Sequence, residues 1–181
     1  MTKQLVSYII FILALILSSC GNDIKVVNSL ASIKDYPVES STNLQIMMSD
    51  SGKLKFKMYC PSFDSYDGEK PYRDLKEGFN AEFYNENMEV ESFISAKKAK
   101  LFNNDMLMDA RVDVLVVNVN GDTLKTPHLI WDREKETLIS DTLVEIITED
   151  GVTFGDGLVS DQNFEVYTIL KPRGSINLDD D

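Results

Sequence analysis

The side chains that could carry out chemistry are few and scattered. His128 is the only histidine of the chain and lies between Pro127 and Leu129. A zinc site needs several nitrogen or sulfur ligands, and neither a second histidine nor a cysteine is close to His128 in the sequence. We therefore predict that His128 is a surface or half-buried residue and not a metal ligand.

The carboxylates do not form a known catalytic or calcium-binding pattern. Asp64, Asp67, Gly68 and Glu69 lack the alternating acidic positions that an EF-hand places before its glycine. A glycosidase needs two carboxylates that face each other in a groove, and no such pair stands out. No serine lies in a nucleophile elbow, and no glycine-rich loop leads into a helix. The sequence thus indicates no catalytic residue, no cofactor and no metal.

Cys20 ends the stretch IIFILALILSSCGND, which runs from Ile9 to Asp23. The apolar part, residues 5–17, has about 13 residues, whereas a helix that crosses a bilayer needs roughly 20. Lys3 precedes it and two serines follow it, the order typical of a secretory signal. The end of this segment, LSSC, resembles the bacterial lipobox, in which cleavage before the cysteine is followed by acylation.

We therefore expect residues 1–19 to be a signal peptide and Cys20 to be the lipidated first residue of the mature chain. The alternative is an uncleaved, slightly short anchor helix; in both cases the rest of the chain is tethered to a membrane. With Cys20 lipidated, Cys60 has no disulfide partner. Cys60 lies in KMYCPSF, where a small half-buried apolar residue is expected.

The charge of the chain limits its partners. Asp and Glu number 30 and Lys and Arg 18, a net charge of −12. An acidic surface repels phosphate backbones, and the chain nowhere interleaves basic and aromatic residues as nucleic-acid binders do. A nucleic-acid partner is not expected. Without residues 1–19 the chain is long enough for one domain with a real core.

The dominant pattern after residue 38 is an alternation of apolar and polar residues with a period of two, which is typical of strands. It is clearest in KLKFKMYC, GFNAEFYN and DARVDVLVVNV. In the last of these the alternation places Ala110, Val112, Val114 and Val116 on one face, opposite Arg111 and Asp113.

Short turn segments separate these runs. Asn120-Gly121 is the sharpest turn signal and predicts a type I′ hairpin, while residues 71–77 offer at most a single helical turn. The chain is expected to be all-β, a meander or jelly roll. We assign residues 20–38 to a lipidated N-terminus and linker, 39–174 to the β-domain and 175–181 to an acidic tail.

The strands carry more bulky apolar side chains than a sheet with one wet face requires. These residues form either a closed sandwich core or an open apolar trough that takes a lipid. The candidates for the lining of such a trough are Phe56, Met58, Phe79, Phe83, Ala110, Val112, Val114, Val116, Trp131, Ile146 and Phe154.

The segment from Ala99 to Leu170 contains a series of short motifs in a fixed order. They are Gly121-Asp122 leading to Leu124-x-Thr126, Leu129-Ile130-Trp131-Asp132, Val144-x-Ile146, Gly155-x-Gly157-Leu158 and a closing strand with Tyr167. In order and spacing this series resembles the LptC family of lipopolysaccharide export components in its Bacteroidetes-like form. The region from Ser40 to Ala99 resembles the family more loosely.

The resemblance implies an open-ended, twisted antiparallel β-jellyroll with no enzymatic activity. It implies a conduit that receives lipopolysaccharide from an inner-membrane ABC transporter and passes it to the next periplasmic jellyroll bridge protein. The expected location is the periplasmic side of the inner membrane, with a lipid anchor or, as in many family members, a single transmembrane helix. The alternative from another class is a lipid-anchored, all-β carbohydrate-binding module or glycosidase.

Overall fold

The computed structural model describes residues 36–102 and 104–177. The expected signal segment and Cys20 lie outside the described residues. The described residues from Pro37 onward belong to one compact unit. Within the described residues there is no helix long and apolar enough to cross a membrane.

Every regular element of the described part is a β-strand, and every pairing between strands is antiparallel. This confirms the prediction of an all-β fold. The strands are β1 (Glu39–Asp50), β2 (Lys53–Tyr66), β3 (Tyr72–Leu75), β4 (Phe79–Tyr84), β5 (Val90–Ala96), β6 (Lys98–Phe102), β7 (Leu107–Asn118), β8 (Thr123–Asp132), β9 (Thr137–Ser140), β10 (Val144–Thr148), β11 (Gly151–Gly155), β12 (Leu158–Asp161), β13 (Tyr167–Ile169) and β14 (Pro172–Asn177).

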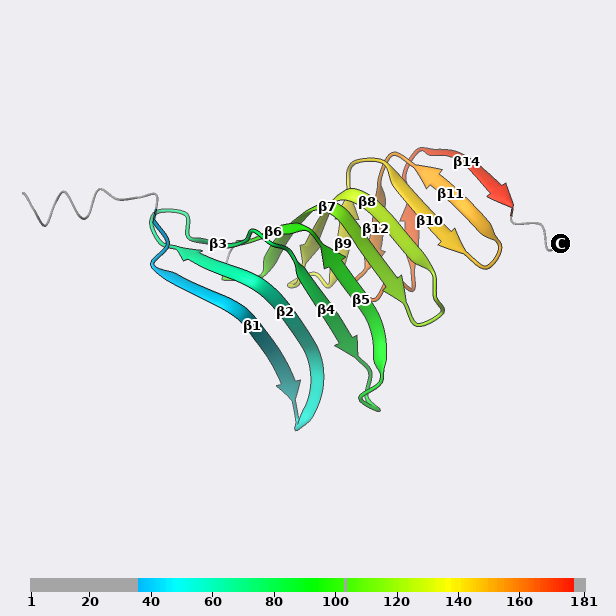
Figure 1. Cartoon of the computed structure of the whole chain (residues 1–181). Helices are drawn as coiled ribbons and strands as arrows, with labels where there is room; N and C mark the ends of the chain where they lie inside the picture. The colour runs from blue at the N-terminus through cyan, green and yellow to red at the C-terminus, as the bar shows by residue number, and fades with distance from the viewer. Residues whose placement is uncertain (1–35, 103, 178–181) are drawn as a thin grey trace, which may run out of the picture. The chain divides into compact units, whose positions relative to one another are not determined.

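The strands form one folded sheet with two walls (Figure 1). The front wall has the order β1-β2-β4-β5-β7-β8-β10-β11-β14. The back wall has the order β1-β2-β3-β6-β7-β8-β9-β12-β13. The strands β1, β2, β7 and β8 are long enough to contribute one half to each wall.

The two walls meet along a fold line that every strand or pair of strands crosses. The residues at the crossings are Asn43 in β1, Pro61 and Ser62 in β2, 76–78 between β3 and β4, Lys97 between β5 and β6, Val112 and Asp113 in β7, Pro127 in β8, 141–143 between β9 and β10, 156–157 between β11 and β12, and 170–171 between β13 and β14.

The buried side of β8 changes parity at this line. In β8, Leu124 and Thr126 are buried before the line, and Leu129 and Trp131 are buried after it. Successive side chains of a strand point to opposite faces, so an unbroken alternation would turn one half of β8 inside out. The bend at Pro127 allows both halves to face the space between the walls.

The prediction that Val112 shares a face with Ala110 and Val114 is wrong. Ala110 and Val114 are buried, whereas 43% of Val112 is exposed. Val112 and Asp113 have φ angles of 65° and 52° and lie at an irregularity in the pairing of β7 with β8. Alternation applies only to extended residues, and this bulge takes Val112 out of it.

Three other local predictions also need correction. Asn120-Gly121 connects β7 and β8, but only Gly121 has a positive φ (86°), so this turn is not type I′. The two-residue turn with both φ positive is Ser51-Gly52, between β1 and β2. Residues 72–75, for which the sequence left open a single helical turn, form β3. The last strand, β14, continues to Asn177, inside the segment assigned to a tail.

A glycine allows two crossings of the fold line to pack closely. Gly78 has a φ of 79°, and a Cβ atom there would lie 2.1 Å from the carbonyl oxygen of Ala96. That carbonyl belongs to the last residue of β5 before the line. Gly52 has nearly the same φ (81°) but no atom within 4 Å of its Cβ position. Comparison of the two glycines therefore distinguishes the effect of a positive φ from the effect of close backbone packing.

We expect Gly52→Ala to lower the free energy of unfolding by about 1–2 kcal/mol, since an alanine with positive φ is strained. Gly78→Ala should lower it by about 1–3 kcal/mol more, because the added methyl group also displaces backbone at the fold line. Denaturant unfolding of both variants measures the difference. Equal losses would mean that the contact with Ala96 does not constrain the fold line.

Candidate functional site

The space between the two walls gathers most of the residues that the sequence marked as lining an apolar trough. Nine of the eleven are less than 10% exposed and belong to one continuous cluster. They are Phe56, Met58, Phe79, Phe83, Ala110, Val114, Val116, Trp131 and Ile146. Their side chains pack on one another, so the interior is filled along most of its length.

The other two candidates lie elsewhere. Val112 is exposed at the fold line, as described above. Phe154 in β11 pairs with Glu145 in β10, and both residues line a hollow on the outer side of the front wall together with Lys125. The alternation that buries Ile146 turns Glu145 and its neighbour Phe154 outward. Neither residue lines the space between the walls.

An aromatic cluster joins the walls at the edge opposite the fold line. Trp131 of the back wall contacts Phe56 and Phe83 of the front wall, with ring centroids 5.7 and 5.1 Å away. The Phe83 and Trp131 rings meet edge to face, at an interplanar angle of 79°. Such pairs add to the stabilisation that burial provides. This cluster closes the mouth of the folded sheet.

A small hollow opens beside the aromatic cluster. It has a volume of about 180 Å³. Its lining residues are Met48, Lys55, Phe56, Phe83, Trp131, Arg133, Glu136 and Gln162. We call this hollow the mouth site. Three of its lining residues, Phe56, Phe83 and Trp131, form the aromatic cluster.

Arg133 covers the mouth site without an ion pair among the described residues. Its guanidinium lies 5.4 Å from the Trp131 ring centre and 5.9 Å from that of Phe56. It donates a hydrogen bond of 3.1 Å to the carbonyl oxygen of Asp105. The buried Trp131 Nε1 has no hydrogen-bond partner in the described part. The mouth site therefore offers apolar surface together with the guanidinium of Arg133.

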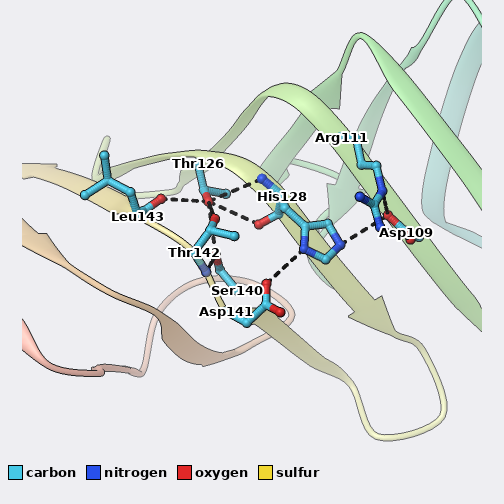
Figure 2. A network of polar contacts seen from close by, with 8 residues as sticks. All are labelled: Asp109, Arg111, Thr126, His128, Ser140, Asp141, Thr142 and Leu143. Carbon is cyan, nitrogen blue, oxygen red and sulfur yellow. Dashed lines mark hydrogen bonds and ion pairs between the residues drawn. The ribbon is translucent and has the colours of Figure 1, made fainter.

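A polar network on the fold line surrounds His128 (Figure 2). Nδ1 of His128 lies 2.9 Å from Asp141 Oδ1 in a hydrogen bond, and Nε2 lies 3.2 Å from Asp109 Oδ1 without hydrogen-bond geometry. Arg111 donates two hydrogen bonds to Asp109, of 2.7 and 2.9 Å. His128 is half-buried, as the sequence predicted.

The hydroxyl groups of the network serve the backbone. Thr126 Oγ1 donates to the carbonyl oxygen of Leu143 at 2.9 Å and lies 3.0 Å from Ser140 Oγ. Both residues are buried at the line where the β8 and β9–β10 ladders break, so the hydroxyls satisfy groups that the ladders leave free. Within the described part the His128 ring contacts carboxylates, not these hydroxyls. This arrangement is structural and does not pair a nucleophile with a base.

The remaining candidates for chemistry are clusters of metal-ligating side chains and the thiol of Cys60. Among the residues that the structure describes, no group of three or more His, Cys, Asp or Glu side chains could hold a metal ion. Cys60 is fully buried, more than the sequence suggested, and burial raises the pKa of its thiol. A raised pKa makes the reactive thiolate scarcer.

Sequence reasoning did not identify Arg133, Met48 or Gln162 as members of the site. Arg133 follows β8 in a charged turn, and its place is set by a backbone hydrogen bond of 2.8 Å to the carbonyl oxygen of Met106. Met48 is on β1, far away in the sequence, and its Sδ accepts a 2.9 Å contact from Arg133 Nη2. No local pattern signals these contacts, because they depend on which strands become neighbours.

Comparison of the sequence with models of known protein families gives no match, and comparison with curated proteins gives none either.

The His128 contact makes a prediction about Asp141. The hydrogen bond from His128 holds the pKa of the Asp141 carboxyl below its usual value. We expect His128→Phe, which lacks the ring N–H, to return that pKa toward the ordinary value of about 3.9. A pH titration of side-chain carboxyl carbons by NMR measures it.

The sign of the effect follows from the lowered pKa. The contact stabilises the folded state above the pKa of the unfolded carboxyl, and this contribution disappears as the pH falls through the folded value. Glu86 is the internal control, because Lys55 and Lys53 lower its pKa to about 2 independently of His128. An unchanged Asp141 pKa in the variant would contradict the assignment.

Proposed function

We propose that this chain is a membrane-tethered, non-enzymatic carrier of lipopolysaccharide, similar to the LptC family. In this proposal the folded sheet is an open-ended β-jellyroll. It receives the lipid from an inner-membrane ABC transporter and passes it to the next periplasmic jellyroll protein. The observation that carries the proposal is the apolar cluster between two facing walls, with a mouth opposite the fold line.

The apolar interior suits acyl chains. Burial of apolar surface contributes about 25 cal/mol per Å², or about 0.8 kcal/mol for each methylene group. Such contacts have little directionality, which suits a ligand that must move on. Because side chains already fill the interior, an acyl chain enters by parting the walls at the mouth site. The Phe56, Phe83 and Trp131 contacts are the first that it replaces.

The ends of the sheet suit assembly with other jellyrolls. Within the described part β1 pairs only with β2 at one end, and β13 and β14 pair only with β12 and β11 at the other. An unpaired edge strand is a template for another strand, and strand addition is a common mode of protein recognition. Edge-to-edge pairing would join the interiors of successive jellyrolls into one continuous path.

The polar residues between the walls favour a carrier over a glycosidase whose groove lies between the walls. The buried polar side chains of the described part are Ser92, Asn118, Thr126, Ser140 and Ser160, none of them a carboxylate. Glycoside hydrolysis in its usual form needs a pair of carboxylates in the groove.

Photo-crosslinking tests the lipid path. Phe83 and Tyr84 are adjacent aromatic residues of β4. Phe83 is buried between the walls, while the Tyr84 hydroxyl donates a hydrogen bond to Glu82 on the opposite face. We expect benzoylphenylalanine at position 83 to capture lipopolysaccharide in cells that contain the transporter. The same probe at position 84 should capture none.

The pair is matched because each substitution replaces one aromatic side chain by another at the same depth along the strand. Equal capture from the two positions would show that the lipid does not run between the walls. The same holds if position 83 captures nothing while the protein stays folded and bound to its transporter.

The membrane tether is tested at Cys20, which lies outside the described residues. Cys20→Ser should leave an unprocessed precursor that incorporates no labelled fatty acid, because the thiol is the acylated group. Cys60→Ala, the matched change at the other cysteine of the chain, should be processed and labelled normally. Normal labelling of Cys20→Ser would refute the lipid anchor.

A further inference from the structure

The outer face of the back wall carries a polar hollow close to the fold line. Its volume is about 600 Å³. The residues that line it are Asp74, Lys76, Lys98, Ala99, Lys100, Asp109 and Arg111. Lys98, Lys100, Asp109 and Arg111 alternate with the buried residues Ala99, Leu101, Met108 and Ala110. The hollow therefore lies on the side of the back wall that faces away from the apolar interior.

The strand register places like charges side by side in this hollow. Lys98 of β6 is directly opposite Arg111 of β7. Like charges in directly opposite positions destabilise a sheet. Neighbouring strands are about 4.8 Å apart, so these two cations lie side by side.

The nearby carboxylates pair with three of the four cations of the hollow. Asp109 accepts two hydrogen bonds from Arg111, Asp74 pairs with Lys100, and Asp64, just outside the lining, pairs with Lys76. Lys98 makes no ion pair with any residue in the described part of the chain. In a chain with a net charge of −12, this hollow thus keeps one uncompensated cation, Lys98, beside Arg111.

The cations and the carboxylates occupy different depths. The side chains of Lys76, Lys100 and Arg111 are 51%, 49% and 59% exposed, whereas those of Asp74 and Asp109 are only 17% and 20% exposed. Cations thus stand at the rim and carboxylates lie at the floor. A bare anion would be attracted by the rim and repelled by the floor. A ligand with an anionic group and several hydroxyl groups satisfies both, because carboxylates accept hydrogen bonds from hydroxyls.

We propose that this hollow binds a sugar phosphate. Lys98 and Arg111 hold the phosphate, and Lys76 contributes to the same field. Asp74 and Asp109 accept hydrogen bonds from the hydroxyl groups of the sugar ring. The proposal is independent of lipid transport between the walls, since the two sites lie on opposite faces of the back wall.

Calorimetric titration of the full-length chain tests the proposal with three soluble probes, namely glucose phosphate, inorganic phosphate and glucose. Glucose phosphate should bind more tightly than either of the others. Lys98→Gln and Arg111→Gln should each weaken its binding roughly fivefold, the loss of one exposed charge contact. Lys135→Gln is the matched control, because Lys135 pairs with Asp132 outside the hollow, and its affinity should equal that of the parent. Asp109→Asn should reduce the preference for glucose phosphate over inorganic phosphate.

The same phosphate-bearing ring can come from a free sugar phosphate or from a lipid headgroup, and vesicles distinguish these sources. Phosphatidylcholine vesicles with and without phosphatidylinositol phosphate are compared in a flotation assay. Binding of glucose phosphate supports a soluble ligand, and binding only to the phosphoinositide vesicles supports a headgroup. Whichever binding is observed must be weakened by Lys98→Gln. The proposal is overturned if neither probe binds, if Lys98→Gln binds like the parent, or if inorganic phosphate binds as tightly as glucose phosphate.

Discussion

The side-chain alternation of β-strands is the constraint on which this structure depends. A sheet that folds onto itself must keep its apolar side chains inside on both sides of the bend, whereas a regular strand that continues past the bend does not guarantee this. Several crossings of the fold line carry a local irregularity. Pro127 has no partner in the pairing of β8 with β7, Val112 and Asp113 adopt left-handed backbone in β7, and Gly78 lets β4 begin against the end of β5.

A folded sheet with one bend has one closed edge and one that opens. Polar groups hold the closed edge, where Thr126 and Ser140 satisfy backbone that has left the ladders. Aromatic contacts hold the other edge, and such contacts are exchangeable for other apolar surface. A folded sheet whose own side chains fill its interior does not expose a large apolar patch to water. Such a patch would favour aggregation. The difference between the two edges is therefore compatible with a sheet that opens at the mouth and keeps its fold line.

The sequence was sufficient to predict the strands and most of the core, because period-two alternation is a local property of the chain. Phe56, Met58, Phe79 and Phe83 are buried as their alternation predicted. It was insufficient for Val112 and Phe154. Val112 is exposed because it lies in a bulge, where the pairing of β7 with β8 is irregular. Phe154 faces outward because it is directly opposite the outward-facing Glu145. Register between strands is non-local, so the mouth site and its Arg133 had no signal in any single segment.

The outer face of the back wall shows the limit of reasoning from net charge. Composition suggests that an acidic protein gains nothing from a phosphate, and at long range this is correct. Charges in solution are screened over about 8–10 Å at physiological ionic strength, so a bound group responds to its nearest neighbours and not to the total. The pairing of β6 with β7 brings Lys98 to Arg111 while the acidic residues are spread over the chain. The sign of the electrostatic potential at a site is thus set by strand register. The register decides which charged side chains are neighbours on the outer face, just as it decides which apolar side chains meet in the interior.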